Sequence, residues 1–318
     1  MMSSRIGTFY PLLKNYTDVN GYDNVIKTVQ KADSNELDFF WTVDIEAHAM
    51  NSSNSNPSVI NAALSMITSK IGLRGESSIA GNQDPLRITE EWSVIDNTSK
   101  GRVGLSIDSC TIDEAAKRIE EKIKAVRTLW QGGSVVRKNG AEIDVELKTF
   151  PKPIQKELPL WVSIKNNNEL MYKMAGAMKA NILVYCLEET VESLAEKINA
   201  YRKAYGNQDH TQGIVSLILP AYLIDKEEKL KAAESTELIT YLDYVNSFYK
   251  TVCNIDLEKE KKYLTYANSL VATKKSSSDF LKQVSSIGVN EIVGILSPKT
   301  SPNKTLELLS FLKKSNHS

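Results

Sequence analysis

Three polar residues with the chemistry of proton transfer follow the most apolar run of the chain. The run covers residues 37–43, and Asp44, Glu46 and His48 come directly after it. Histidine is the natural proton carrier near neutral pH, and carboxylates can act beside it as acids, bases or hydrogen-bond acceptors. The same residues also fit a loop whose polar side chains are simply solvated. The pattern marks a candidate acid–base cluster at the end of a predicted strand.

Three further apolar runs end in polar clusters that could hold a ligand: Gly75, Glu76 and Ser77; Asp108 and Ser109; and Ser163, Lys165, Asn166 and Asn167. Glycine and small residues allow a ligand to approach the backbone closely. In the last cluster a helix is predicted to begin, so its free N–H groups and the charge of Lys165 favour an anion. The asparagines can equally cap this helix with no ligand present.

The elements that must position these clusters alternate along nearly the whole chain. Predicted strands begin near residues 5, 37, 71, 103, 160, 181, 214 and 291, and nearly all are followed by a predicted helix. Eight such units favour an α/β fold of the (β/α)8 TIM-barrel type over a doubly wound sheet. No G-x-G-x-x-G motif follows the first strand, which removes the main support for a dinucleotide-binding sheet. In such a barrel the active site lies at the carboxyl ends of the strands, where all four clusters are predicted.

The sequence predicts one barrel domain over residues 1–318, with two irregular segments. Residues 132–150 have the pattern of a hairpin inserted before the fifth strand, with a two-residue turn at Asn139 and Gly140. Residues 222–280 are predicted as a mostly helical region before the eighth strand.

Bulk composition excludes several classes of function. The 318 residues are 42% hydrophobic, and 39 basic residues balance 39 acidic ones, which argues against a nucleic-acid partner. No apolar run reaches membrane-spanning length and no secretory leader is recognisable, so we expect a cytoplasmic protein. The three cysteines, Cys110, Cys186 and Cys253, are widely spaced and do not form a metal-binding motif. We therefore predict no metal site.

One stretch carries a family resemblance. The run E-E-W-S-V-I-D-N-T-S-K-G-R-V-G-L-S, residues 90–106, resembles the same segment of luciferase-like flavin monooxygenases, in particular the branch associated with natural-product assembly lines. Trp41-Thr42, Asn56-Pro57, residues 129–132, residues 151–162 and residues 288–291 also fit the family pattern. Within residues 222–280 little can be matched.

The resemblance implies a barrel enzyme that takes reduced FMN from a separate flavin reductase and uses O2 to oxidise a small or carrier-tethered substrate. It places the flavin ring near Asp44, Glu46 and His48, with the backbone of residues 75–77 close to the ring. It also places the flavin phosphate at the turn that begins with Ser163 and Lys165. A dimer is implied as well, with helices 57–69 and 86–98 packing against a partner. The apolar residues of these helices could instead only cover the barrel.

The sequence departs from the family pattern at several of these positions. An ungapped alignment from Trp41 puts Ile45 where bacterial luciferases carry their catalytic histidine, with His48 as the nearest substitute. Glu76 would bring a carboxylate toward an anionic reduced flavin. After Asp108 and Ser109, about a dozen residues of the usual loop are missing, and Ser109 stands near the place of a phosphate-binding arginine.

These departures leave three alternatives open. The first is an FMN-dependent monooxygenase acting with a reductase and, if the substrate is tethered, with a carrier protein. The second is a catalytically degenerate barrel that acts as a non-catalytic subunit or ligand-binding partner of an active paralogue. The third, an aldolase-like or other non-flavin barrel, lacks the paired lysines or metal-binding carboxylates that it would need. The chain accordingly forms either a homodimer or a heterodimer.

Overall fold

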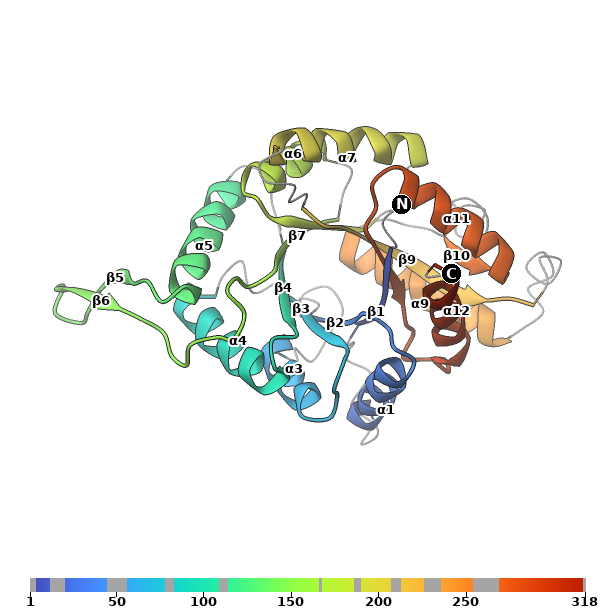
Figure 1. The fold of residues 1–318 in the computed structure, drawn as a ribbon, viewed down its shortest axis with the longest axis horizontal. Helices are drawn as coiled ribbons and strands as arrows, with labels where there is room; N and C mark the ends of the chain where they lie inside the picture. Colours follow the sequence, from blue (N-terminus) through green and yellow to red (C-terminus); the bar gives the residue numbers. More distant parts are fainter. Residues whose placement is uncertain are drawn as a thin grey trace.

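A computed structural model describes residues 4–11, 21–44, 56–77, 83–108, 114–165, 168–185, 190–206, 213–225, 236–253 and 269–316. Eight parallel strands follow one another in the order β9–β11–β1–β2–β3–β4–β7–β8, and pairing of β8 with β9 closes the ring. Helices surround this ring (Figure 1). The predicted (β/α)8 barrel is confirmed, and all eight predicted strands are present.

The barrel strands are β1 (Arg5–Pro11), β2 (Phe39–Asp44), β3 (Gly72–Ser77), β4 (Val103–Asp108), β7 (Leu160–Ile164), β8 (Asn181–Tyr185), β9 (Val215–Leu223) and β11 (Glu291–Ile295). The described helices are α1 (Gly21–Ser34), α3 (Pro57–Ser65), α4 (Pro85–Ser99), α5 (Glu114–Trp130), α6 (Glu169–Ala177), α7 (Val191–Tyr205), α9 (Thr236–Cys253), α11 (Lys274–Ser286) and α12 (Asn303–Ser315).

The barrel strands are buried on both faces, because helices cover the outside and side chains fill the inside. In β7, β9 and β11 every residue is buried, which explains their continuous apolar sequences. An inner core fills the barrel with large side chains, including Phe9, Phe39, Trp41, Trp161, Leu183, Ile218 and Val293. A second, outer core packs the other face of the strands against the amphipathic helices. Each large side chain buried in these cores contributes roughly 1.5–3 kcal/mol.

A buried ion pair closes the amino end of the barrel interior. Arg74 of β3 donates two hydrogen bonds to Glu291 of β11, at 2.6 and 3.0 Å, and both residues are buried. The guanidinium lies between two rings, 4.0 Å from the centroid of Phe39 and 4.3 Å from that of Trp161. Ser216 donates a further bond of 2.6 Å to Glu291. Burial alone would raise the pKa of Glu291, but the charge and hydrogen bonds of Arg74 outweigh it and hold this pKa below its ordinary value.

Hydrogen bonds connect α4 and the turn after it, which carry the run that resembles the family, to residues 152–155 and to the entry of β3. Asp96 of α4 is fully buried, and its carboxylate accepts bonds from the N–H groups of Ile154 and Gln155, at 2.5 and 2.9 Å, and from the Gln155 side chain. Asn97 donates to the Lys152 carbonyl oxygen at 2.9 Å. Arg102 donates to the carbonyl oxygens of residues 68 and 71 at the entry to β3. The most specific residues of the resemblance therefore hold the scaffold together.

Two irregular segments interrupt the alternation. The strands β5 (Val135–Lys138) and β6 (Asp144–Leu147) form an antiparallel hairpin between α5 and β7, and Figure 1 shows it projecting away from the barrel. Its turn covers residues 139–143 rather than two residues, because the Asn139 side chain accepts the N–H groups of Ala141 and Ile143. Within residues 222–280 the described part contains α9, the start of α11 and the short strand β10 (Leu270–Ala272), which pairs with β9.

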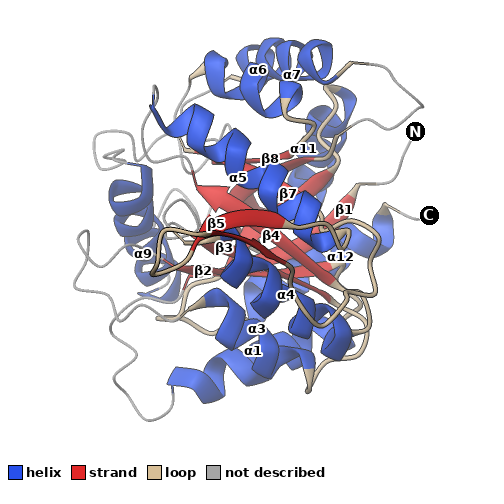
Figure 2. Ribbon diagram, turned by 90° about the vertical axis from the view of Figure 1, so that its left-hand side faces the viewer, coloured by secondary structure: helices blue, strands red, loops and turns tan. Residues whose placement is uncertain are grey.

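Helix α9 covers part of one end of the barrel. Figure 2 shows it at the end away from the chain termini, and its residues contact side chains near the carboxyl ends of the strands. Phe248 is fully buried, with its ring centroid 5.7 Å from that of Phe9 and 6.2 Å from that of Tyr185. The Tyr241 hydroxyl donates to the Ile295 carbonyl oxygen at 2.9 Å and accepts from the Ala221 N–H at 2.7 Å. Aromatic packing and these two bonds fix α9 over β1, β8, β9 and β11.

Candidate functional site

A buried carboxylate lies inside the barrel near the carboxyl ends of the strands. Alternation along β3 directs Arg74 and Glu76 to the same interior face, with Arg74 at the amino end and Glu76 two residues further on. The Glu76 side chain is fully buried. A charged carboxylate at such a position requires polar partners, because burial otherwise disfavours its ionised form.

Two groups from other strands supply partners for Glu76. Tyr185, the last residue of β8, donates its hydroxyl hydrogen to Oε2 of Glu76. Lys165, directly after β7, places its Nζ atom 3.4 Å from Oε1 of Glu76 and 5.7 Å from the Tyr185 ring centroid. Because β4 and β7 lie between β3 and β8 in the ring, the Tyr185 contact spans the barrel interior. A carboxylate, a phenol and an ammonium group thus meet at one point.

Further polar groups line the same part of the interior. The hydroxyls of Ser106 on β4 and Ser163 on β7 lie 2.7 Å apart and share a hydrogen bond, and both side chains are buried. Lys165 differs from these neighbours because 20% of its side chain is exposed. Among the described residues, the site therefore combines a buried interior with a partly exposed cation, Lys165, which suits a ligand that is partly apolar and partly anionic.

The predicted site residues are distributed as follows. Glu76, Ser163 and Lys165 lie together, as described above. The backbones of Asp44 and Ser77 pair at the ends of β2 and β3, and Asp108 pairs with Ser163 at the end of β4. The remaining predicted site residues lie outside the described part of the chain, so their roles stay predictions: Glu46, His48, Ser109, Asn166 and Asn167.

Gly75 faces the helices rather than the barrel interior. A Cβ atom added to Gly75 would lie 2.7 Å from Cη2 and Cζ2 of the Trp92 ring and 3.1 Å from Pro57. The close approach that excludes a side chain here is that of α4 and α3. Any contact of Gly75 with a flavin would therefore come from its backbone.

At the turn after β7, a side chain caps the start of α6, and an acidic residue lies in the first turn of this helix. Asn168 caps α6 by accepting the Leu170 N–H at 3.0 Å, and the first turn carries the acidic Glu169. Lys165 points to Glu76 rather than along the helix axis. Phosphate binding at this turn stays a prediction, while the observed charge partner of Lys165 is a carboxylate.

Two contributors to the site escaped the sequence analysis. Tyr185 is the last residue of a predicted strand, and the search for polar residues at the carboxyl ends of strands could have found it. Phe248 lies within a long helix of unmatched sequence, and no local signal distinguishes it from its aromatic neighbours. Among the residues that the structure describes, no group of three or more His, Cys, Asp or Glu side chains could hold a metal ion.

The sequence and fold were compared with known proteins. A sequence profile of the family described as "Luciferase-like monooxygenase" matches residues 5–283. The chain belongs to the luciferase-like monooxygenase family. No curated protein matches the chain significantly.

Several solved structures share the fold at low sequence identity. Monooxygenase RslO1 from Streptomyces bottropensis is 15% identical, with a TM-score of 0.74 and 98% of each chain covered. The oxygenating constituent of 3,6-diketocamphane monooxygenase from Pseudomonas putida, solved in complex with FMN, is also 15% identical, with a TM-score of 0.73 and the same coverage. An F420-dependent secondary alcohol dehydrogenase is 14% identical, with a TM-score of 0.73 and 98% of each chain covered.

The residues of this luciferase-like barrel fit a flavin-type cofactor. Lys165 offers a partly accessible positive charge, and the aromatic inner core offers apolar walls at the same end of the barrel. Glu76 has partners of its own at this end of the barrel: Tyr185 donates to Oε2, and the Lys165 ammonium lies 3.4 Å from Oε1. None of the helices that the structure describes is both long and apolar enough to cross a membrane.

Proposed function

We propose that the protein is a flavin-dependent monooxygenase that uses reduced FMN and O2 to oxidise a small or carrier-tethered natural-product intermediate. The observation that carries the proposal is the meeting of Glu76, Tyr185 and Lys165 at the carboxyl end of a luciferase-like barrel. Titratable groups gathered inside a barrel of this type, at the end where its active sites lie, are costly to bury and typical of functional sites. The likeness to an FMN-bound oxygenase and to a monooxygenase supports the same choice.

The flavin, when bound, would supply the reaction with O2, and the protein would supply position, charge and apolar surroundings. Lys165, which is partly exposed, is proposed to contact the flavin phosphate, as the family resemblance implies. Glu76 keeps the Lys165 ammonium at the rim and holds the Tyr185 hydroxyl proton at Oε2. Phe248 and Phe9 exclude water on the β1 and β8 side of the interior.

Flavin titration tests the proposal directly. Purified protein is titrated anaerobically with reduced FMN, and aerobically with FMN, following absorbance and fluorescence. Micromolar affinity for reduced FMN is the expected result, and the absence of binding below about 1 mM would refute the proposal. A parallel titration with F420 separates FMN use from F420 use, since a solved relative depends on F420.

Variants connect this binding to Lys165. We expect Lys165→Met to weaken reduced FMN at least about tenfold, because a charge-assisted contact is worth about 1.5–3 kcal/mol. Lys173→Met is the matched control, since Lys173 lies on α6 and pairs with the exposed Glu169. Equal affinity in both variants would show that Lys165 has no role in flavin binding.

A second function is favoured by one specific observation. Glu76 places a carboxylate where the family sequence pattern has small residues, and the Lys165 ammonium that could serve a flavin lies 3.4 Å from this carboxylate instead. A barrel of this kind could serve as a non-catalytic subunit of an active paralogue. Failure to bind either flavin, together with stable association with a catalytically active luciferase-like subunit, is the result that this alternative predicts.

The proposed oligomer uses the faces of α3 and α4. Val59 and Met66 in and after α3 and Val94 on α4 are apolar and exposed, at 64%, 72% and 46%. Exposed apolar side chains grouped on two packed helices are typical of interfaces. We propose that this face packs against a second copy or a paralogue, and that a flavin reductase and a carrier protein are the other partners. Light scattering of the parent and of Met66→Asp tests the homodimer, which the charged residue should dissociate.

A further inference from the structure

The hairpin between α5 and β7 forms a small sheet of its own outside the barrel. No residue of β5 or β6 is buried, and Figure 1 shows the hairpin extending away from the ring of helices. Nε of Arg137 on β5 lies 3.8 Å from Oδ2 of Asp84, which caps the start of α4. An isolated two-stranded hairpin is only marginally stable in water and needs a further surface to pack against. The exposure of this hairpin therefore points to a partner surface.

The hairpin and the segment that follows it, residues 132–154 and called the arm below, expose large apolar side chains. Val136 lies on β5, Ile143 lies in the hairpin turn, and Phe150 and Ile154 follow β6. Each of these four side chains is between 56% and 70% exposed. Exposed apolar side chains grouped in this way are typical of a surface that meets another molecule.

The base of the arm continues the exposed apolar face of α3 and α4. Asn97 of α4 donates to the carbonyl oxygen of Lys152 in the arm, and it lies one helical turn after the exposed Val94. The hydroxyls of Ser65 and Thr98, 2.8 Å apart, join the ends of α3 and α4. The arm and the two helices therefore present one continuous surface.

The helix face alone is too small for a stable dimer. A large aliphatic side chain corresponds to about 60–120 Å² of apolar area, and Val59, Met66, Ile67 and Val94 are each roughly half exposed, so together they can bury at most about 240 Å² more. A homodimer interface buries about 800 Å² on each copy and is about 65% apolar, which requires about 500 Å² of apolar area. The four exposed side chains of the arm raise the total to about 480 Å². The arm and the helix face together reach the area that a dimer needs.

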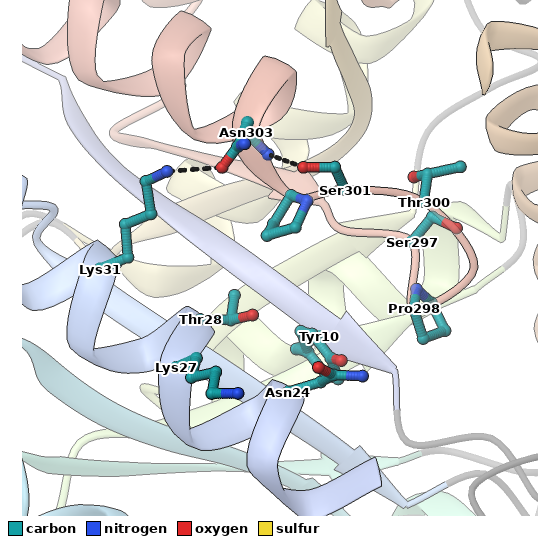
Figure 3. Close-up of a pocket in the computed structure, with 11 residues that line it drawn as sticks. Tyr10, Asn24, Lys27, Thr28, Lys31, Ser297, Pro298, Thr300, Ser301 and Asn303 are labelled. Atoms are coloured by element: carbon teal, nitrogen blue, oxygen red, sulfur yellow. Dashed lines mark hydrogen bonds between the residues drawn. The ribbon is translucent and has the colours of Figure 1, made fainter. Parts of the chain in front are cut away.

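The cavity beside α1 is a poor complement for the arm. It lies between α1 and residues 297–303 and has a volume of about 310 Å³. Figure 3 shows polar side chains on both of its walls, among them Lys27, Lys31 and Ser301. The apolar side chains of the arm would separate these polar groups from water without replacing their hydrogen bonds. The exposed apolar face of α3 and α4 is the better match.

From these observations we propose that the arm docks on the α3 and α4 face of a second copy of this chain, and that the arm of the second copy docks on the first in return. A twofold axis produces both contacts at once, because the same surface then serves on each copy. Each arm and each helix face is covered once in this arrangement. The inference rests on the oligomer proposed above and does not depend on flavin binding.

Sedimentation velocity of the full chain over a range of concentrations tests the role of the arm. We expect a dimer with a dissociation constant of about 1 μM or tighter. The double variant Val136→Asp/Ile143→Asp should weaken it at least about a hundredfold, because two carboxylates would lose water in the interface. Leu170→Asp changes an exposed apolar residue of α6 outside both surfaces, and it is the control that should leave the dimer unchanged. All three positions are exposed in the single chain, so circular dichroism should show an unchanged fold.

Cross-linking between chains tests which surface receives the arm. A chain with Ile143→Cys is mixed with a differently tagged chain with Met66→Cys, and a flexible bismaleimide is added after the copies have exchanged. We expect a cross-linked product that carries both tags, since the arm of one copy lies over α3 and α4 of the other. A mixture of Ile143→Cys with Leu170→Cys is the control, and the parent shows the background from the native cysteines.

Three results would overturn the proposal. The first is a parent chain that stays monomeric at the highest concentration used. The second is a dimer that dissociates in Met66→Asp but not in the double variant of the arm, which would leave a dimer built on α3 and α4 alone. The third is cross-linking to Met66→Cys that is no stronger than cross-linking to Leu170→Cys. Titration of the same proteins with reduced FMN decides the flavin proposal separately.

Discussion

Gly75→Ala is the sharpest test of how the predicted cofactor segment is arranged. The added methyl group would lie 2.7 Å from two ring atoms of Trp92 and 3.1 Å from Pro57, all in a buried layer. Ordinary carbon contacts are about 3.5–4.0 Å, so either the ring or the strand must move. Overpacking of this kind typically costs about 1–3 kcal/mol. We expect the free energy of unfolding to fall by that amount.

A double-mutant cycle assigns the loss to Trp92. Trp92→Phe removes the two ring atoms that the new methyl group would meet. In the Trp92→Phe background, Gly75→Ala should therefore cost less, with a coupling of about 0.5–3 kcal/mol between the two positions. Urea unfolding of the parent, both single variants and the double variant measures this coupling, provided that the m-value stays constant.

Gly140→Ala provides the control, because a Cβ atom at Gly140 would meet nothing within 4 Å. Its effect should stay within about 0.5 kcal/mol, as for most surface substitutions. The reasoning fails if Gly75→Ala is as mild as this control, or if its cost is unchanged by Trp92→Phe. Loss of flavin binding without loss of stability would mean that Gly75 faces the ligand instead.

Three other predictions follow from buried contacts. Glu291→Gln should cost about 3–5 kcal/mol near neutral pH, because it leaves the buried Arg74 without its counter-charge. The folded-state pKa of Glu291 is lowered from 4.5, so the stability difference between the parent and Glu291→Gln should be constant above about pH 5 and shrink as the pH falls below 4.5. Urea unfolding of both proteins between pH 3 and 8 measures this difference. A difference that does not decline at low pH would contradict the prediction. Asp96→Ala should lower the free energy of unfolding by roughly 1.5–3 kcal/mol and speed proteolysis of the segment 151–159, because the hydrogen bonds from this segment to Asp96 are lost. An unchanged cleavage rate would show that these bonds do not hold the segment against α4. Phe248→Ala should cost about 3–5 kcal/mol in thermal unfolding, whereas a loss under about 1 kcal/mol would contradict the tight packing of α9.

The barrel could be predicted from the sequence because each strand carries its own signal. A parallel strand covered on both sides is apolar at nearly every position, and the strand Leu160–Ile164, in which all five residues are buried, is an example. The ends of α4 carry sequence signals of their own: Asp84 and Pro85 are typical of a helix start, and Gly101, which has positive φ, is typical of a helix end. The hairpin turn was predicted too short because the side-chain bonds of Asn139 compete with the two-residue turn.

The site was less predictable, because its contacts join distant parts of the chain. The sequence placed Lys165 at a helix start, but only the fold brings Glu76 from another strand to its ammonium group. Gly75 was selected because glycine lets a ligand approach the backbone closely, yet the direction of its missing side chain depends on which face of β3 meets α4. Polarity at a strand end can therefore be predicted from sequence, whereas the partner of each polar group cannot.

The ion pair at the amino end of the barrel has an evolutionary consequence. Arg74, Glu291 and the rings around Arg74 connect four strands, β2, β3, β7 and β11, at the end of the barrel opposite Glu76. A stable fold tolerates destabilising substitutions anywhere in the chain, because each one is subtracted from the free energy of unfolding of the whole domain. Glu76 is such a change, and the chain retains the barrel at 15% identity to its solved relatives. In this barrel the buried Arg74–Glu291 pair therefore lies at one end of the strands, and the cluster of Glu76, Tyr185 and Lys165 lies at the other.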